Sequence, residues 1–162
     1  MTDRSDLLDK MDSDLLETTV KLATIFKEKG GSLLLVGGSV RDLILNLSPH
    51  ELDFEARGPS LEEIKEWLSK DFRYHEVGKA FGVLHIKGYP IEIALPRTET
   101  KSGTGHKGFD VQIDSDLPFE RAVQRRDFTI NAMGLCPLTG HLLDPCDGYS
   151  DINSRILRHV GP

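Results

Sequence analysis

The sequence predicts an α/β (α+β) fold in which a mixed sheet is flanked by helices. Segments with helical periodicity alternate along the chain with short apolar segments that are typical of strands. Residues 83–95 have the pattern of a hairpin, which adds antiparallel pairing to strands that helices connect. The chain has 162 residues, of which 38% are apolar, and this size suits one domain with a sizeable core.

Composition narrows the class of protein. The formal net charge of −6 argues against a chain that binds nucleic acid tightly by itself, although it leaves room for a local cationic site. No apolar run reaches the length of a membrane span, and the acidic, polar residues 1–16 resemble neither a signal nor a transit peptide. Cys136 and Cys146 lack metal-ligand or redox spacing and are expected to be reduced thiols. We therefore expect a cytoplasmic protein.

The first half of the chain contains four predicted elements. Apolar residues recur at helical spacing from residue 15 to residue 26, with Ser13 as the expected N-cap and Gly30-Gly31 as the end of the helix. The next segments are a buried strand "SLLLV", a short helix "SVRDLILNL" and an alternating strand "LDFEA".

The second half continues the alternation. "SLEEIKEWLSK" is predicted to be a helix with a Ser60/Glu63 capping box, and residues 83–95 a hairpin that turns at residues 88–90. Residues 97–108 look like a loop, either a mobile active-site loop or a plain surface loop. Helical character returns in "DLPFERAVQRRDFTINAM", with Pro118 near its start, and two turns then precede a short helical stretch.

The glycine pair between the first strand and the short helix is the first candidate binding feature. Gly37 and Gly38 have no Cβ, so a ligand can approach the backbone, and the helix start favours phosphate. Ser39 adds a hydroxyl donor, and Arg41 adds a forked cation that suits phosphate oxygens. A plain strand–helix turn with an Arg41–Asp42 ion pair has the same sequence, and the motif alone leaves both interpretations open.

Acidic residues on two predicted strands form the second candidate site. Asp53 and Glu55 share one strand face with their bases about 7 Å apart, so both can converge on a divalent cation. Glu92 joins them if the second hairpin strand pairs near residues 52–56. Such oxygen ligands suit Mg²⁺ that is held jointly with substrate phosphates. An ordinary solvent-facing acidic strand has the same pattern.

The third candidate is the charged trio Arg125, Arg126 and Asp127, which places two forked cations beside an acceptor. The trio suits phosphate or a ribose hydroxyl. A salt-bridge cluster at a helix end has the same composition.

Together these segments resemble the class II tRNA nucleotidyltransferases, which are the CCA-adding enzymes and bacterial poly(A) polymerases of the DNA polymerase β superfamily. The resemblance covers roughly residues 31–161 and rests on five segments in the family's order and spacing: "GGSVRDLIL", "LDFEA", "IEIALPRTE", "RRDFTINAM" and "LLDPCDGYSDINSRILRHVG". It implies a polymerase-β-like head domain. It also implies Mg²⁺-dependent transfer of a nucleotide from ATP or CTP to the 3′ end of RNA, in particular tRNA, with release of pyrophosphate.

The resemblance also implies roles for individual residues. The implied triphosphate contacts are Gly37, Gly38, Ser39 and Arg41. The implied ligands of a two-metal site are Asp53 and Glu55, with Glu92 in the place of a third carboxylate. The implied sugar and phosphate contacts are Arg125, Arg126 and Asp127.

The chain departs from the family pattern in two places. The usual Asp-x-Asp pair is Asp53-x-Glu55 here, which is one methylene longer. The Glu-Asp-x-x-Arg motif, through which the family templates the base, does not occur in these 162 residues. We therefore interpret residues 1–162 as a head domain with an N-terminal helix in about residues 1–30. Residues 140–162 would begin the connection to a missing neck, and most RNA contacts are expected in that missing C-terminal region.

Three hypotheses follow from this interpretation. The chain is the catalytic head of a tRNA nucleotidyltransferase or poly(A) polymerase, or a short nucleotidyltransferase that works with a partner chain. The third hypothesis is a non-catalytic nucleotide-binding or regulatory module that keeps the fold.

Overall fold

The computed structural model describes residues 2–78, 82–101, 103–104 and 108–161. Its strands are β1 (Thr2–Asp3), β2 (Ser32–Val36), β3 (Leu52–Arg57), β4 (Tyr74–Val77), β5 (Val83–Ile86), β6 (Ile91–Ala94), β7 (Arg97–Lys101), β8 (Phe109–Ile113), β9 (Gly134–Leu135) and β10 (His141–Leu143). Its α-helices are α1 (Ser5–Leu8), α2 (Ser13–Glu28), α3 (Gly38–Ile44), α4 (Leu61–Leu68), α5 (Phe119–Ala122) and α6 (Gly148–Ser154). Two 3₁₀ turns are η1 (Val123–Arg125) and η2 (Thr129–Asn131).

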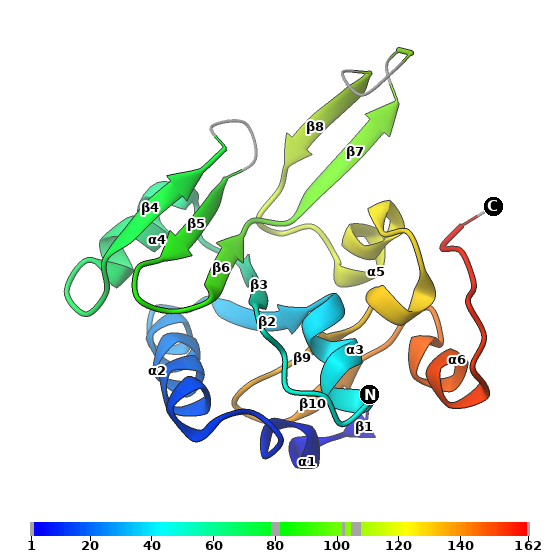
Figure 1. Cartoon of the computed structure of the whole chain (residues 1–162). Helices are drawn as coiled ribbons and strands as arrows, with labels where there is room; N and C mark the ends of the chain where they lie inside the picture. Colours follow the sequence, from blue (N-terminus) through cyan, green and yellow to red (C-terminus); the bar gives the residue numbers. More distant parts are fainter. Residues whose placement is uncertain (1, 79–81, 102, 105–107, 162) are drawn as a thin grey trace.

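Eight strands form one mixed sheet in the order β1-β10-β9-β2-β3-β6-β5-β4. Among the described pairs of this sheet, β3 and β6 run parallel and the others run antiparallel. β7 and β8 form a separate two-stranded ribbon that projects from the body of the molecule (Figure 1). The predicted mixed sheet with flanking helices is confirmed.

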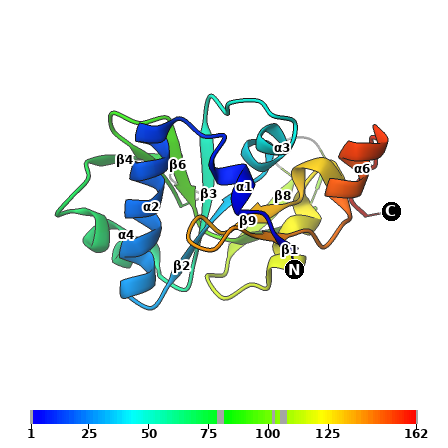
Figure 2. The same ribbon diagram turned by 90° about the horizontal axis from the view of Figure 1, so that it is seen from below.

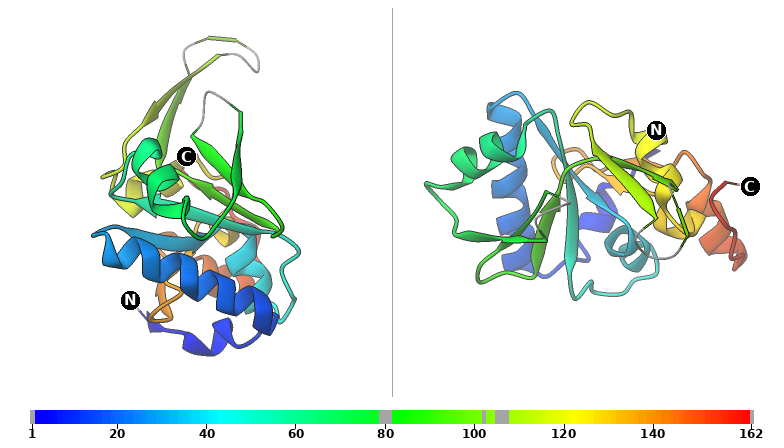
Figure 3. Two further views of the ribbon diagram at one scale, coloured as in Figure 1. Left: turned by 90° about the vertical axis from the view of Figure 1, so that its left-hand side faces the viewer. Right: turned by 90° about the horizontal axis from the view of Figure 1, so that it is seen from above.

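The apolar run of β2 is buried on both faces of the sheet. Leu33 and Leu35 belong to the larger core, which α1, α2, α3 and α4 complete from one side (Figure 2). Leu34 and Val36 belong to a smaller core with residues of α5 and η1 on the other side. Figure 3 shows α2 and the β7–β8 ribbon on opposite sides of the sheet. A strand covered on both faces explains why its sequence is continuously apolar.

Of the two predicted helix N-caps, one is confirmed and one is wrong. The capping box of α4 is confirmed, because the Ser60 side chain accepts from the backbone of Glu63 and the Glu63 side chain accepts from the backbone of Ser60. The Ser13 cap is wrong by one residue: the N-cap of α2 is Asp12, whose carboxylate accepts from the Leu15 N–H. Aspartate and serine cap equally well, so propensity alone does not choose between neighbouring candidates.

The predicted loop at residues 97–108 is wrong over its first half. Residues 97–101 form β7, which pairs antiparallel with β8 from Arg97–Ile113 to Lys101–Phe109. The ribbon stands apart from the main sheet, so its strands carry no alternating core face that a sequence pattern would reveal. Residues 102 and 105–107 lie outside the described residues.

The segments after the ribbon are shorter than their sequence suggests. Helical character in residues 116–133 is confirmed, with Pro118 as the N-cap of α5, but it is divided among α5, η1 and η2. The short helix predicted after the second turn is α6. The hairpin predicted over residues 83–95 is confirmed as β5 and β6. No helix in the described part of the chain is long and apolar enough to cross a membrane.

Leu43 should contribute strongly to the packing of helix α3. Leu43 is fully buried in the larger core, whereas Leu45, one residue beyond the helix, is 46% exposed. We expect Leu43→Ala to lower the free energy of unfolding by about 2–5 kcal/mol, because it leaves a cavity in the core. The matched variant Leu45→Ala should cost less than about 1 kcal/mol. Urea unfolding measures both changes, and equal losses would contradict this packing.

Candidate active site

The glycine pair lies where β2 turns into α3. Gly37 has a φ of +70°, a backbone conformation that residues other than glycine rarely adopt. Its N–H donates to the Met133 carbonyl. A Cβ added at Gly37 would lie 3.0 Å from Nη1 of Arg126, and one added at Gly38 would lie 3.1 Å from Nη2 of Arg41. The absence of side chains therefore allows two guanidinium groups to lie against this turn.

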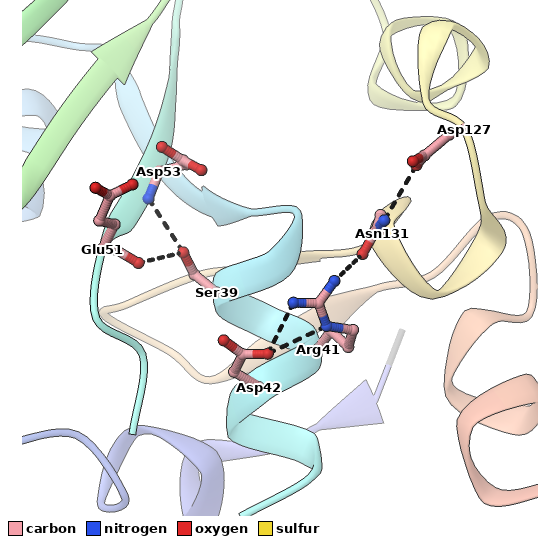
Figure 4. Close-up of polar contacts among 7 residues, drawn as sticks. All are labelled: Ser39, Arg41, Asp42, Glu51, Asp53, Asp127 and Asn131. Atoms are coloured by element: carbon pink, nitrogen blue, oxygen red, sulfur yellow. Dashed lines mark hydrogen bonds and ion pairs between the residues drawn. The ribbon is translucent and has the colours of Figure 1, made fainter. Parts of the chain in front are cut away.

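Ser39 is buried and its hydroxyl is used within the protein. The side chain, 3% exposed, donates to the Glu51 carbonyl at 3.0 Å and accepts from the Asp53 N–H at 3.1 Å (Figure 4). The hydroxyl thus joins α3 to the start of β3 at the residue that carries a predicted metal-binding carboxylate. Its predicted contact with a nucleotide stays a prediction.

The Arg41 guanidinium group takes part in a hydrogen-bond network that links α3 to the segment after α5. Its Nε and Nη2 donate to Oδ1 of Asp42, and its Nη1 donates to Oδ1 of Asn131 at 2.7 Å (Figure 4). Asn131 in turn donates to Asp127 at 3.0 Å. This hydrogen bond lowers the pKa of Asp127, and the Phe128 N–H adds to the shift. Arg41 and Asp127 therefore connect α3 to the segment after α5.

The three acidic candidates converge on one cavity. In the parallel pairing of β3 with β6, Asp53 lies opposite Glu92 and Glu55 lies opposite Ala94. Asp53, Glu55 and Glu92 all line a cavity of about 200 Å³. The second hairpin strand, β6, therefore pairs with residues 52–55, as the shared site of Asp53, Glu55 and Glu92 requires.

The two carboxylates of β3 have different surroundings. Glu55 is 4% exposed, and its Oε1 accepts from Nη1 of Arg57 at 2.5 Å. Asp53 is exposed, and its backbone N–H rather than its carboxylate contacts Ser39. Partial desolvation by the surrounding protein nevertheless raises the pKa of Asp53; Arg126 opposes this rise and Glu51 adds to it.

Three arginines line the same cavity: Arg97, Arg125 and Arg126. We call these arginines the cationic wall of the cavity, and Asp53, Glu55 and Glu92 its acidic wall. Glu99 on β7 accepts from Nε of Arg97 at 2.9 Å and lies 4.0 Å from Nη1 of Arg125. Nε of Arg125 is buried without a hydrogen-bond partner in the described part of the chain. Desolvation by burial lowers the pKa of Arg125 to about 10, and Arg126 and Arg97 add to the shift. Arg125 therefore stays charged at neutral pH in surroundings that disfavour its charge.

The structure brings together most but not all of the predicted residues. Asp53, Glu55, Glu92, Arg125 and Arg126 share the cavity. Arg41 lines a separate apolar hollow beside α6. The glycine pair lies between the two groups, because Gly37 faces Arg126 and Gly38 faces Arg41.

Sequence reasoning missed Arg97, Glu99 and Asn131 as site or support residues. Arg97 and Glu99 lie in the segment predicted to be a loop, and only the alternation Arg-Thr-Glu indicates a strand with both charges on one side. Asn131 lies 90 residues from its partner Arg41, and no local pattern predicts such a contact.

The carboxylates of the cavity suit a metal ion that is bound jointly with a substrate. Among the described residues, no three His, Cys, Asp or Glu side chains form a group that could hold a metal ion by themselves. Magnesium at phosphoryl-transfer sites usually takes one or two carboxylates and completes its shell with phosphate oxygens and water. Asp53, with Glu55 and Glu92 on the same cavity, fits that mode of binding.

Residues 33–158 match the family model described as the poly A polymerase head domain. The chain belongs to this family.

Curated relatives give a finer likeness. The chain is 46% identical over 127 residues to the CCA-adding enzyme of Blochmanniella floridana, which covers 78% of this chain and 29% of that protein. It is 44% identical over 131 residues to the multifunctional CCA protein of Stenotrophomonas maltophilia (strain K279a), with coverage of 80% and 31%. The chain thus spans about a third of the length of these relatives.

Solved structures share the fold. The apo form II of a CCA-adding enzyme superposes with a TM-score of 0.81 and 26% identity, covering 99% of this chain and 38% of that one. The Thermotoga maritima CCA-adding enzyme complexed with tRNA gives a TM-score of 0.76 at 26% identity, with coverage of 99% and 36%. The Bacillus stearothermophilus enzyme in complex with CTP gives 0.71 at 26% identity, with coverage of 93% and 34%.

The Ser39 hydroxyl should contribute measurably to stability. Ser39→Ala leaves the Glu51 carbonyl and the Asp53 N–H without this partner, so we expect a loss of about 1–3 kcal/mol in the free energy of unfolding. The control Ser32→Ala, at an exposed position, should stay within about 0.5 kcal/mol of wild type. Urea unfolding compares the two, and a neutral Ser39→Ala would show that the hydroxyl does not hold β3 to α3.

Proposed function

We propose that this chain is the catalytic head of a tRNA nucleotidyltransferase of the CCA-adding type. It would transfer a nucleotide from CTP or ATP to the 3′ end of tRNA. The supporting observation is the cavity that three acidic residues, Asp53, Glu55 and Glu92, line together with three arginines. The relatives of 39–46% identity that bear the CCA name support the choice of substrate.

The cationic wall suits the triphosphate. Arg125 carries its charge in a partly desolvated position, and its orphaned Nε is a donor that an anionic oxygen would satisfy. Arg126 lines the same cavity. The bare backbone at Gly37 lets the guanidinium group of Arg126 lie against the turn while Arg126 also lines the cavity. Arg97, held by Glu99, adds a third cation on the same wall.

The acidic wall suits Mg²⁺, which Asp53 and Glu55 would hold, with Glu92 beside them. When bound there, Mg²⁺ supplies electrostatic stabilisation for the attacking and leaving oxygens of an in-line displacement. The RNA 3′-oxygen forms a bond to the α-phosphorus as the bond to pyrophosphate breaks. The residues of the cavity position the two substrates and neutralise their charge, which suffices for phosphoryl transfer without a covalent nucleophile.

A poly(A) polymerase is the second candidate, because the matching family model bears that description. The two activities differ in the RNA they accept and in the nucleotides they add. The test supplies the chain with tRNA that lacks its terminal CCA, and with an unstructured RNA, in the presence of labelled CTP or ATP. Ordered addition of C and then A to tRNA supports the CCA-type function, and repeated A addition to either RNA supports poly(A) synthesis. Nucleotide binding without any addition would favour the non-catalytic module.

The carboxylates of β3 should be required for incorporation. Asp53→Ala combined with Glu55→Ala removes the two proposed metal ligands, so we expect nucleotide incorporation to fall by at least about a hundredfold. The matched control combines Glu17→Ala with Glu28→Ala, two exposed carboxylates on α2. Incorporation of labelled nucleotide is measured with and without a chelator. Unchanged metal-dependent incorporation in the β3 double variant would refute the assignment.

Arg126 should govern affinity for the nucleotide. Arg126→Ala removes a guanidinium group from both the cavity and the glycine turn, and loss of a charge-assisted contact worth about 1.5–3 kcal/mol should weaken ATP binding roughly tenfold to a hundredfold. Lys70→Ala, at an exposed position beyond α4, removes the same charge and should leave binding unchanged. Titration calorimetry with ATP measures both, and equal affinities would contradict this role.

A further inference from the structure

A row of polar side chains crosses four strands and begins at the proposed catalytic carboxylate. Asp53 on β3 lies opposite Glu92 on β6, Glu92 lies opposite His85 on β5, and His85 lies opposite His75 on β4. Because neighbouring strands are about 4.8 Å apart, the row extends about 14 Å from Asp53. The site surface therefore continues beyond the cavity itself.

The burial of alternate residues shows which face the row occupies. Leu84 and Ile86 on β5 are fully buried in the core beneath the helices. Glu76 on β4 forms an ion pair with Lys65 of α4, so it also points to the helix side. Val83 lines the cavity with Asp53 and Glu92. His85, two residues after Val83, and His75, opposite it, therefore face the cavity side.

The two histidines lie against each other, and two cations accompany them. The imidazole centroids are 5.0 Å apart at an interplanar angle of 41°. In the next row, the Lys87 N–H donates to the Arg73 carbonyl at 2.8 Å, and both residues are exposed. Alternation places the side chains of Arg73 and Lys87 on the side of the histidines, since the neighbouring Phe72 and Ile86 are buried.

These four residues, Arg73, His75, His85 and Lys87, make up what we call the β4–β5 surface. The remaining residues on this face of the two described strands are Val77 and Val83, so the surface carries no carboxylate of its own. It is thus a local cationic face on a chain of net charge −6. Its edge adjoins Glu92 and, through it, Asp53.

We propose that the β4–β5 surface binds the single-stranded 3′ end of the substrate RNA, immediately upstream of the nucleotide that reacts at Asp53. This inference rests on the proposed function. Arg73 and Lys87 neutralise backbone phosphates, and the paired imidazoles offer flat faces on which unpaired bases stack. The row leads from this surface directly to the acidic wall, so a strand bound along it delivers its 3′-hydroxyl to the cavity. Cations and aromatic rings side by side match RNA better than an acidic protein segment, which has no bases to stack.

The charge test compares two double variants of the full chain. Arg73→Gln with Lys87→Gln removes two cations from the β4–β5 surface, and Lys27→Gln with Lys29→Gln removes two exposed cations at the end of α2 on the helix side. The probe is a fluorescein-labelled minihelix RNA with a single-stranded 3′ tail ending in CC. Anisotropy titrations over a range of salt should show weaker binding for the first variant only. Its slope of log affinity against log salt should be smaller by about 1.4, as expected for two lost phosphate contacts on a single strand.

The stacking test replaces both histidines. His75→Ala with His85→Ala should weaken binding of the same RNA at least about fivefold without changing the salt slope. A photo-crosslink from a 4-thiouridine in the 3′ tail should map to β4 or β5 in wild type and be lost in this variant. Circular dichroism and the thermal midpoint establish that each variant is folded.

The outcomes separate this proposal from the proposed function. Equal losses in the two charge variants, or no loss in either, would overturn the β4–β5 surface. Labelled polyglutamate that binds as tightly as the RNA, with the same dependence on Arg73 and Lys87, would also overturn it in favour of an acidic protein partner. RNA binding that depends on this surface, combined with no nucleotide incorporation on any RNA, would uphold the surface and refute the proposed catalytic function. ATP affinity should be unchanged in all the variants of this surface.

Discussion

The parallel pairing of β3 with β6 is the constraint on which the site depends. It places Asp53 beside Glu92 and extends through β5 and β4 to the two histidines. A parallel pair cannot be joined by a tight turn, so the chain between them crosses over and supplies α4, β4 and β5 on the way. A register shift of one residue would turn the acidic side chains toward the core and Leu52 and Phe54 toward the opposite face of the sheet. The burial of those two residues therefore fixes the register of the acidic wall.

The charges at the cavity are only partly compensated within the protein. Glu55 is satisfied by Arg57, and Glu99 holds Arg97 and lies near Arg125. Burial raises the pKa of Asp53 and lowers that of Arg125, so on both walls the surroundings disfavour the charged form. Groups of opposite sign that line one cavity and have perturbed pKa values are characteristic of functional sites. A phosphate-bearing ligand with a divalent cation would compensate both walls at once.

Sequence reasoning succeeded where the determining pattern is local. Alternation in "LDFEA" and "IEIAL" predicted the faces of β3 and β6, because side chains on a strand alternate whatever the strand pairs with. It failed at β7, because the β7–β8 ribbon stands apart from the main sheet and β7 therefore lacks an alternating pattern of apolar residues. The contacts of the Ser39 hydroxyl were also beyond it, because they depend on how closely α3 approaches β3.

The remaining question is why the glycine motif and "RRDFTINAM" occur together in one chain. Two neighbouring residues of "RRDFTINAM" have different contacts. Arg126 lies against Gly37 beside the cavity. Asp127 accepts a hydrogen bond from Asn131, and Asn131 accepts one from Arg41, which lies against Gly38. A side chain at either glycine would press on one of the two guanidinium groups. Each motif therefore has one residue that faces the proposed ligand and one that ties the motifs together. The cationic wall then depends on α3 and on the segment after α5 keeping their relative positions, which neither element could ensure alone.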